Sequence, residues 1–129
     1  MHTRTDHPVA WARAQNNLAF ALTIQANRTG GAAGAALLAE AIAAFSAALE
    51  VHTRADHPVD WAKTQGNLAN AERDLALRPT TRQPAKHLAS ALAHVDAALT
   101  VYDAIHMAYN FGTATRLRSD ILGLLAAAP

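Results

Sequence analysis

Histidine and aspartate recur in two clusters whose side chains could bind a metal ion or transfer protons. The clusters lie 50 residues apart and comprise His2, Asp6 and His7, then His52, Asp56 and His57. A zinc site needs three or four convergent ligands, whereas each cluster comes directly before a proline that can open a helix. An aspartate that accepts hydrogen bonds at a helix start accounts for the pattern more simply. We therefore expect no metal site, and keep a small metal-binding protein or enzyme built on these clusters as a third hypothesis.

Other arrangements that carry chemistry cannot be assembled from this sequence. Gly30, Gly31 and Gly34 lack the preceding strand and the following lysine of a phosphate-binding loop. The chain has no cysteine, which excludes disulfides, thiolate metal ligands and a thiol nucleophile. No Ser/His/Asp set or pair of catalytic carboxylates is recognisable. We expect no enzymatic activity, no catalytic residue and no cofactor.

Length and composition indicate one soluble domain that is rich in helix. The chain has 129 residues and a net charge of +1, and it is rich in alanine but poor in aromatic residues. This charge gives no basic field for nucleic acid. The most apolar tract, 32–51, is mostly alanine and is broken by Glu40 and Ser46, so we expect no membrane span. The polar N-terminus has no apolar signal core, and we expect a cytoplasmic protein.

The strongest pattern is an internal repeat with a period of 50 residues. Residues 2–22 and 52–72 match at 14 of 21 positions without a gap. Each copy predicts a helix that begins at Pro8 or Pro58 and a second, alanine-rich helix with a narrow apolar stripe. The glycine run at 30–34 is expected to end the first helix. The stripes are Leu38, Ile42, Phe45 and Leu49, then Leu88, Leu92, Val95 and Leu99.

These residues resemble a tetratricopeptide repeat of the long-period bacterial or kinesin-light-chain-like kind. The first copy reads His-Pro-x-x-Trp-Ala-x-x-Gln-x-Asn-Leu-Ala-x-Ala, then a turn, then Ala-Ile-x-x-Phe-x-x-Ala-Leu. The period of 50 exceeds the usual repeat of about 34 residues. The resemblance implies an all-α, right-handed solenoid of about five antiparallel helices in a single domain, 1–129. Its parts are repeats at 8–54 and 58–104 and a capping helix at 108–127.

The resemblance also implies that the Trp-bearing helices line a concave surface that binds a protein or peptide. Asparagine can donate to and accept from an extended backbone, and a cation pairs with a carboxylate. Alternatively, Asn17 and Asn67 only satisfy backbone groups in the turn between units. The groove residues expected on this basis are Arg13, Asn16, Asn17, Phe20, Lys63, Asn67, Asn70 and Arg73.

The first Trp-bearing helix has no helix before it in this sequence, whereas the second one has. Its face toward a preceding neighbour would be bare, and Trp11, Ala14 and Leu18 would lie on that face. An exposed apolar patch of several hundred Å² normally marks an interface. We expect this end to form a homodimer, or the natural protein to continue upstream. The leading function is a protein- or peptide-binding scaffold, and the alternative is a self-associating structural module without a separate ligand.

Overall fold

Five α-helices build the described part of the chain, which contains no strand. The computed structural model describes residues 3–128. The helices are α1 (Pro8–Asn27), α2 (Gly31–Leu49), α3 (Pro58–Ala76), α4 (Pro84–Leu99) and α5 (Ala108–Ala127). The prediction of an all-α chain with about five helices is therefore confirmed.

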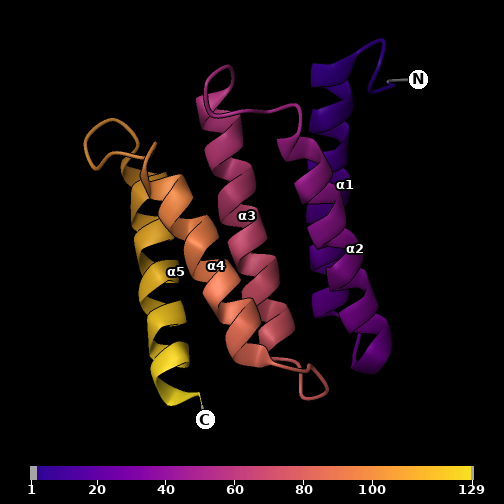
Figure 1. Cartoon of the computed structure of the whole chain (residues 1–129), viewed down its shortest axis with the longest axis vertical. Helices are drawn as coiled ribbons and strands as arrows, with labels where there is room; N and C mark the ends of the chain where they lie inside the picture. The colour runs from indigo at the N-terminus through magenta and orange to yellow at the C-terminus, as the bar shows by residue number, and fades with distance from the viewer. Residues whose placement is uncertain (1–2, 129) are drawn as a thin grey trace.

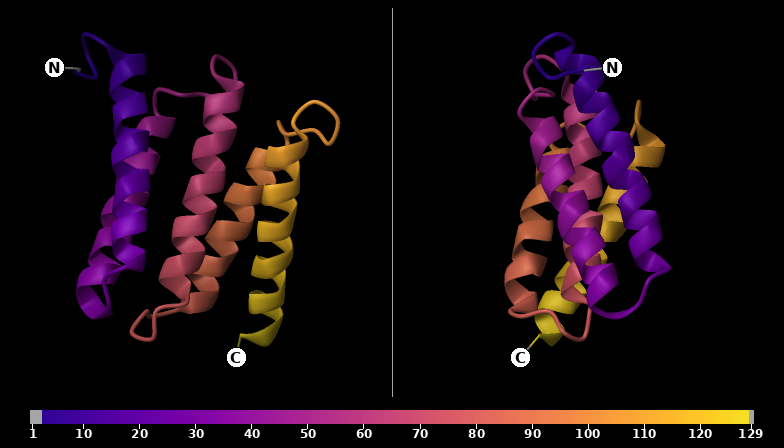
Figure 2. Two further views of the ribbon diagram at one scale, coloured as in Figure 1. Left: turned by 180° about the vertical axis from the view of Figure 1, so that it is seen from behind. Right: turned by 90° about the vertical axis from the view of Figure 1, so that its right-hand side faces the viewer.

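The helices alternate in direction and lie in two layers (Figure 1). One layer contains α1, α3 and α5, and the other contains α2 and α4, as the views from behind and from the side show (Figure 2). Each helix packs mainly on its neighbours in the chain, whereas α1 and α5 each touch α3 at few positions. The middle helix of the first layer, α3, therefore has a helix of the same layer on both sides.

Proline sets the start of three helices. α1, α3 and α4 each carry proline in the first turn, where its missing N–H would have had no helical partner. The expected aspartate caps do not form, because His7 and His57 are the N-caps of α1 and α3 and neither makes a side-chain cap bond. Instead, the backbone N–H of each aspartate donates to a threonine hydroxyl three residues earlier, at 3.1 and 3.2 Å. The same turn thus precedes both Trp-bearing helices.

The glycine run opens α2 instead of ending α1, contrary to the expectation. α1 ends at Asn27, and α2 begins at Gly31 with a left-handed φ of 66° that favours glycine. Gly34, in the first turn of α2, lies against the carbonyl oxygen of Thr29 and the guanidinium of Arg78. A Cβ at this position would clash with both groups, so the chain needs a glycine where the two repeat units meet.

Small residues let the helices approach closely in the core. One buried cluster joins α1, α2 and α3, and a second joins α3, α4 and α5. Both contain several alanines with few large side chains, which is the composition that brings helix axes close together. The largest fully buried side chains are Phe45 and Leu68 in the first cluster and Ile121 and Val95 in the second.

Equivalent residues of the two repeats make equivalent contacts before each Trp-bearing helix. The guanidinium of Arg4 lies 5.5 Å from the ring centroid of Trp11, and that of Arg54 lies 5.9 Å from that of Trp61. Both arginines also bind the C-cap residue of the second helix of their unit. Arg4 contacts Glu50 at the end of α2, and Arg54 contacts Thr100 at the end of α4. The repetition in sequence therefore corresponds to repetition of local structure.

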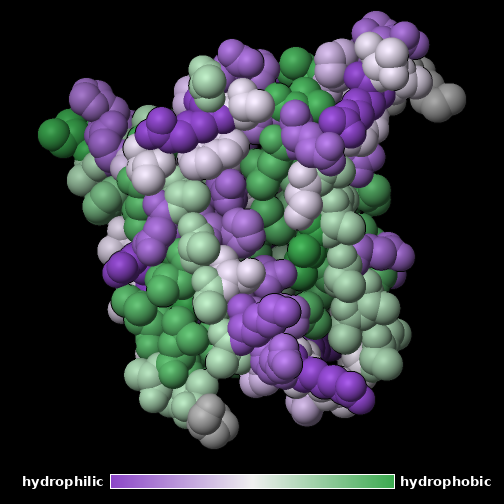
Figure 3. All heavy atoms as spheres, viewed as in Figure 1, coloured by the Kyte–Doolittle hydropathy of each residue, from purple (hydrophilic) through white to green (hydrophobic). Residues whose placement is uncertain are grey.

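The most apolar helix is α2, and it is long and apolar enough to cross a membrane by length and composition. The sequence had not suggested this for residues 32–51. Leu38, Ala41, Phe45 and Ala48 of α2 are buried inside the protein, and core helices of soluble proteins pass the same test. The outward surface of α2 is pale and weakly apolar, as expected for alanine (Figure 3). A single helix of this kind does not distinguish a membrane span from a core helix.

Candidate functional site

Two hollows lie on either side of α3 in the layer formed by α1, α3 and α5. The lysine hollow, between α3 and α5, has a volume of about 220 Å³. The phenylalanine hollow, between α1 and α3, has a volume of about 270 Å³. Lining residues that define the lysine hollow are Lys63, Gly66, Asn67, Asn70, Tyr102 and Asn110. Those that define the phenylalanine hollow are Phe20, Ile24, Phe45, Asn67, Asn70 and Arg73.

Asn67 and Asn70 belong to both hollows. They lie three residues apart on α3 and therefore on one helical face. Asn70 donates a long hydrogen bond of 3.4 Å to the carbonyl oxygen of Gly66, and the Asn67 amide has no hydrogen-bond partner within residues 3–128. Both side chains are half-buried. Each amide therefore retains donor and acceptor capacity that a ligand can use.

The two hollows differ in chemistry. The lysine hollow has a cation and no carboxylate in its lining, and Lys63 forms no ion pair in the described part of the chain. The hydroxyl of Tyr102 is protonated at neutral pH and can donate a hydrogen bond, and burial raises its pKa further. In the phenylalanine hollow, Phe20 and Ile24 remain 48% and 44% exposed. The first hollow thus favours an anion, and the second favours an apolar group.

Asn16 does not contribute to either hollow. Its Nδ2 atom donates to Thr64 Oγ1 at 2.7 Å and so bridges α1 and α3. Its Oδ1 atom is buried and has no partner within the described residues. The residue at the same position of the second repeat is Gly66, and the space that a Cβ would occupy there is open. The missing side chain helps to keep the lysine hollow open.

Arg73 lines the phenylalanine hollow, but its charge is already paired. Its guanidinium contacts Asp120 of α5 at 3.0 Å and the neighbouring Asp74 at 3.2 Å. The ion pair with Asp120 connects α3 with α5, and the two carboxylates together leave Arg73 poorly suited to bind a ligand carboxylate. A further hollow of about 400 Å³ lies beside this pair and includes the exposed Arg116.

Arg13 and Asn17 are exposed on α1 and line none of these hollows. The side of α1 that corresponds to the Lys63 side of α3 faces α3, and there Asn16 bonds to Thr64, whereas Gly66 leaves the equivalent space beside Lys63 open. The structure therefore brings Phe20, Lys63, Asn67, Asn70 and Arg73 to the hollows and places Arg13, Asn16 and Asn17 elsewhere.

The face of α1 that was expected to mediate self-association is partly open. Leu18 is 52% exposed, whereas Leu68, at the same position of the second repeat, is 1% exposed because α2 covers it. Ala14 is exposed as well, and Trp11 is partly buried. The contrast arises from the neighbouring helix, because the two leucines occupy equivalent positions.

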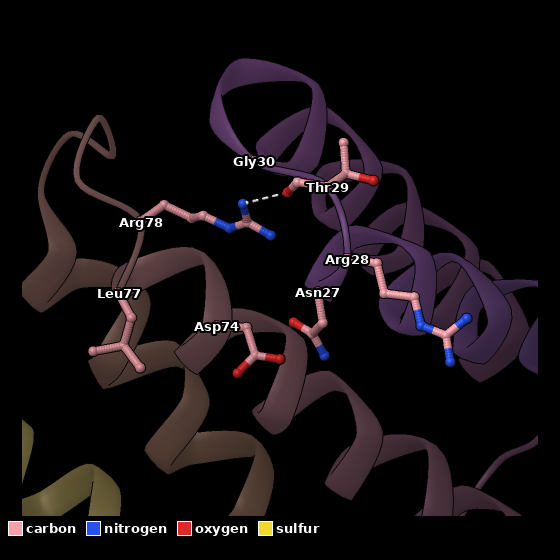
Figure 4. Close-up of a pocket in the computed structure, with 7 residues that line it drawn as sticks. All are labelled: Asn27, Arg28, Thr29, Gly30, Asp74, Leu77 and Arg78. Carbon is pink, nitrogen blue, oxygen red and sulfur yellow. Dashed lines mark hydrogen bonds between the residues drawn. The ribbon is translucent and has the colours of Figure 1, made fainter.

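A hollow of about 410 Å³ at the end of α1 and α3 is crossed by Arg78 (Figure 4). The Arg78 guanidinium donates to the carbonyl oxygens of Thr29 and Ala26, at 2.8 and 2.5 Å. These carbonyls belong to the C-terminal end of α1, where the helix dipole favours a cation. We interpret this contact as structural. The sequence signal for it was the recurrence of arginine at 28 and 78.

His52 of the second cluster is buried without a hydrogen-bond partner among the described residues. It is 1% exposed, and its ring lies 5.2 Å from that of His57. Burial lowers the pKa of His52, Asp60 opposes this effect, and His57 and Arg13 add to it. Within residues 3–128, no three His, Asp or Glu side chains are arranged to hold a metal ion. His2 of the first cluster lies outside the described residues.

Two side-chain hydrogen bonds connect α3 and α4 in the second repeat and form a polar seam between them. His94 Nδ1 donates to Gln65 Oε1 at 2.6 Å, and His87 Nδ1 donates to Glu72 Oε2 at 3.1 Å. Burial lowers the pKa of His94, and the charge of Glu72 opposes this effect. The first repeat has Leu37 and Leu22 where the second has His87 and Glu72, so the seam is a feature of the second repeat alone.

Comparison with known proteins gives no further assignment. No family model, no curated protein and no solved structure matches the chain. The geometry of the hollows and the repeat in the sequence are therefore the features that bear on function.

Proposed function

We propose that the chain is a tetratricopeptide-like scaffold that binds an extended segment of a partner protein on the surface of α1, α3 and α5. In this proposal two helical hairpins stack as a right-handed solenoid, and α5 caps the stack. The observation that carries the proposal is the position of Asn67 and Asn70, which belong to both hollows and keep free hydrogen-bonding capacity.

An extended peptide has backbone N–H and C=O groups that are not paired within the peptide. If the peptide were helical, its own hydrogen bonds would already pair most of these groups, whereas in an extended peptide they are available to a binding surface. Two amides on one helical face can pair with these groups while side chains of the peptide enter the hollows. Stacked helical hairpins provide an extended surface of the size that such recognition needs.

Selection from a display library of random twelve-residue peptides tests this proposal. We expect enrichment of peptides whose affinity falls about tenfold or more in the Asn67→Ala variant, because two ligand hydrogen bonds are lost. Asn17→Ala is the matched control, because Asn17 is the equivalent residue of the first repeat and lines no described hollow. Equal loss in both variants, or no enrichment at all, would contradict the proposal.

The exposed face of α1 supports a second candidate function, self-association of the chain. Leu18 and Ala14 are exposed at positions whose equivalents, Leu68 and Thr64, are buried in the second repeat. Light scattering coupled to size-exclusion chromatography tests this candidate. A dimer that Leu18→Glu converts to a monomer would support it, and a monomer at high concentration would exclude it.

A further inference from the structure

The different linings of the two hollows point to the side chains that the bound segment carries. We infer that the segment presents an acidic side chain to the lysine hollow and, within two residues of it, an apolar side chain to the phenylalanine hollow. This inference rests on the proposed function and adds the chemistry of the partner to it.

The lysine hollow fits a carboxylate. Lys63 supplies a positive charge that forms no ion pair with a carboxylate of the described chain, and Asn67, Asn70 and Asn110 add amide groups to the lining. Tyr102 of the lining adds a hydroxyl donor, since a tyrosine hydroxyl is protonated at neutral pH. A volume of about 220 Å³ equals that of about seven water molecules, which is enough for a carboxylate side chain with a few waters.

The phenylalanine hollow fits an apolar side chain. Phe20 and Ile24 of α1 are about half exposed and face a space that also includes Phe45. The charged groups in this lining, Arg73 and Asp74, are paired with each other at 3.2 Å. A ligand charge therefore finds no unpaired partner of opposite sign here, whereas an apolar group gains contact with two exposed side chains.

The shared asparagines set the distance between the two ligand side chains. Because Asn67 and Asn70 line both hollows, the hollows are separated by little more than these two side chains. An extended chain advances about 3.3 Å per residue, and successive side chains point to opposite sides. The acidic and the apolar residue are consequently neighbours, or are separated by one residue, in the bound segment.

Synthetic peptides test the inference directly. The probe is a set of nine-residue peptides of glycine, serine and threonine with one aspartate and one leucine, separated by zero, one, two or four residues. The ends are acetylated and amidated, so that the aspartate side chain supplies the single carboxylate. Affinity is measured by titration of ¹⁵N-labelled protein, monitored through the side-chain amide signals of Asn67 and Asn70.

We expect the peptides with zero or one intervening residue to bind best. Replacement of the peptide aspartate by asparagine should weaken binding about tenfold. Lys63→Gln should abolish this difference, whereas Arg13→Gln, the equivalent change in the first repeat, should preserve it. Similarly, Phe20→Ala should abolish the preference for leucine over serine, and Leu18→Ala, an exposed position on the same helix outside the hollow, should preserve it.

Several results would overturn the inference. These are equal binding of the aspartate and asparagine peptides, an unchanged preference in Lys63→Gln, or binding of the asparagine peptide only when it is made with a free C-terminal carboxylate in place of the amide. If library peptides still bind through Asn67 while these preferences are absent, the inference fails and the proposed function stands. If neither the designed peptides nor library peptides shift the signals of Asn67 and Asn70, both fail.

Discussion

Truncation of Leu68 to alanine should destabilise the protein far more than truncation of Leu18, although the two leucines occupy equivalent positions in the repeats. Leu68 is 1% exposed and packs with Phe45 and Ala71, whereas Leu18 is 52% exposed. A buried leucine-to-alanine change costs about 3 kcal/mol, because the transfer free energy is lost and a cavity remains. At a site that is half exposed and can be refilled by water, the cost should be about 0.5–1 kcal/mol.

Urea and thermal denaturation followed by circular dichroism measure both variants against the unmodified chain. For a domain of this size, a difference of about 2 kcal/mol between them corresponds to a difference in Tm of about 6–10 °C. Measurements at two protein concentrations separate a monomer from a dimer that covers Leu18. Equal losses of stability at low concentration would refute the reasoning, because α2 would then not be the cause of the different environments.

Three further changes test individual contacts. Gly34→Ala should cost about 1–3 kcal/mol in urea denaturation, since its Cβ would meet a backbone carbonyl. Arg78→Ala should cost about 2 kcal/mol by the same measurement through loss of two hydrogen bonds to carbonyls of α1, and the exposed Arg28→Ala should cost little. Since burial lowers the pKa of His52 below its unfolded value of 6.5, the unfolded state binds more protons and stability falls as the pH falls below about 6.5. His52→Phe should flatten this dependence in a Tm series from pH 8 to pH 5, and a series parallel to that of the unmodified chain would contradict it.

The start of the Trp-bearing helices could be predicted from sequence because a local property determines it. Proline at 8 and 58 lacks an N–H and has a fixed φ, and both helices begin there. The apolar stripes also predicted which faces of α2 and α4 are buried. Helical periodicity alone places Leu38 and Phe45 on one face of α2, and Leu88 and Val95 on one face of α4.

The environment of equivalent residues could not be predicted from the residue type. Arginine occupies the equivalent positions 28 and 78, but only Arg78 donates hydrogen bonds to carbonyl oxygens at the end of α1. Lys63 and Arg13 are equivalent as well, but Lys63 lines a hollow between α3 and α5, whereas Arg13 lines no hollow between α1 and α3. The repeat therefore indicated which residue types recur, whereas the position of each unit in the row decides what those residues contact.

Part of the candidate site lies beyond the region in which the repeat is recognisable. Asn110 contributes to the lysine hollow, and Asp120 neutralises Arg73, yet both belong to α5, where the sequence no longer matches the earlier copies. Alignment of the repeats carries no information on these residues. Gly66 leaves open space in the lysine hollow because it has no side chain, and the recurrence of residue types does not indicate this effect.

The most direct test of the proposed recognition surface is the response of the asparagine side-chain amides to a bound peptide. In a ¹H–¹⁵N spectrum recorded with the aspartate- and leucine-containing peptide, we expect the amide signals of Asn67 and Asn70 to shift in a saturable manner. The signal of Asn17, the equivalent residue outside the hollows, should stay in place. A shift of Asn17 in preference to Asn67, or no shift of Asn67 and Asn70 with any peptide, would contradict recognition at α3.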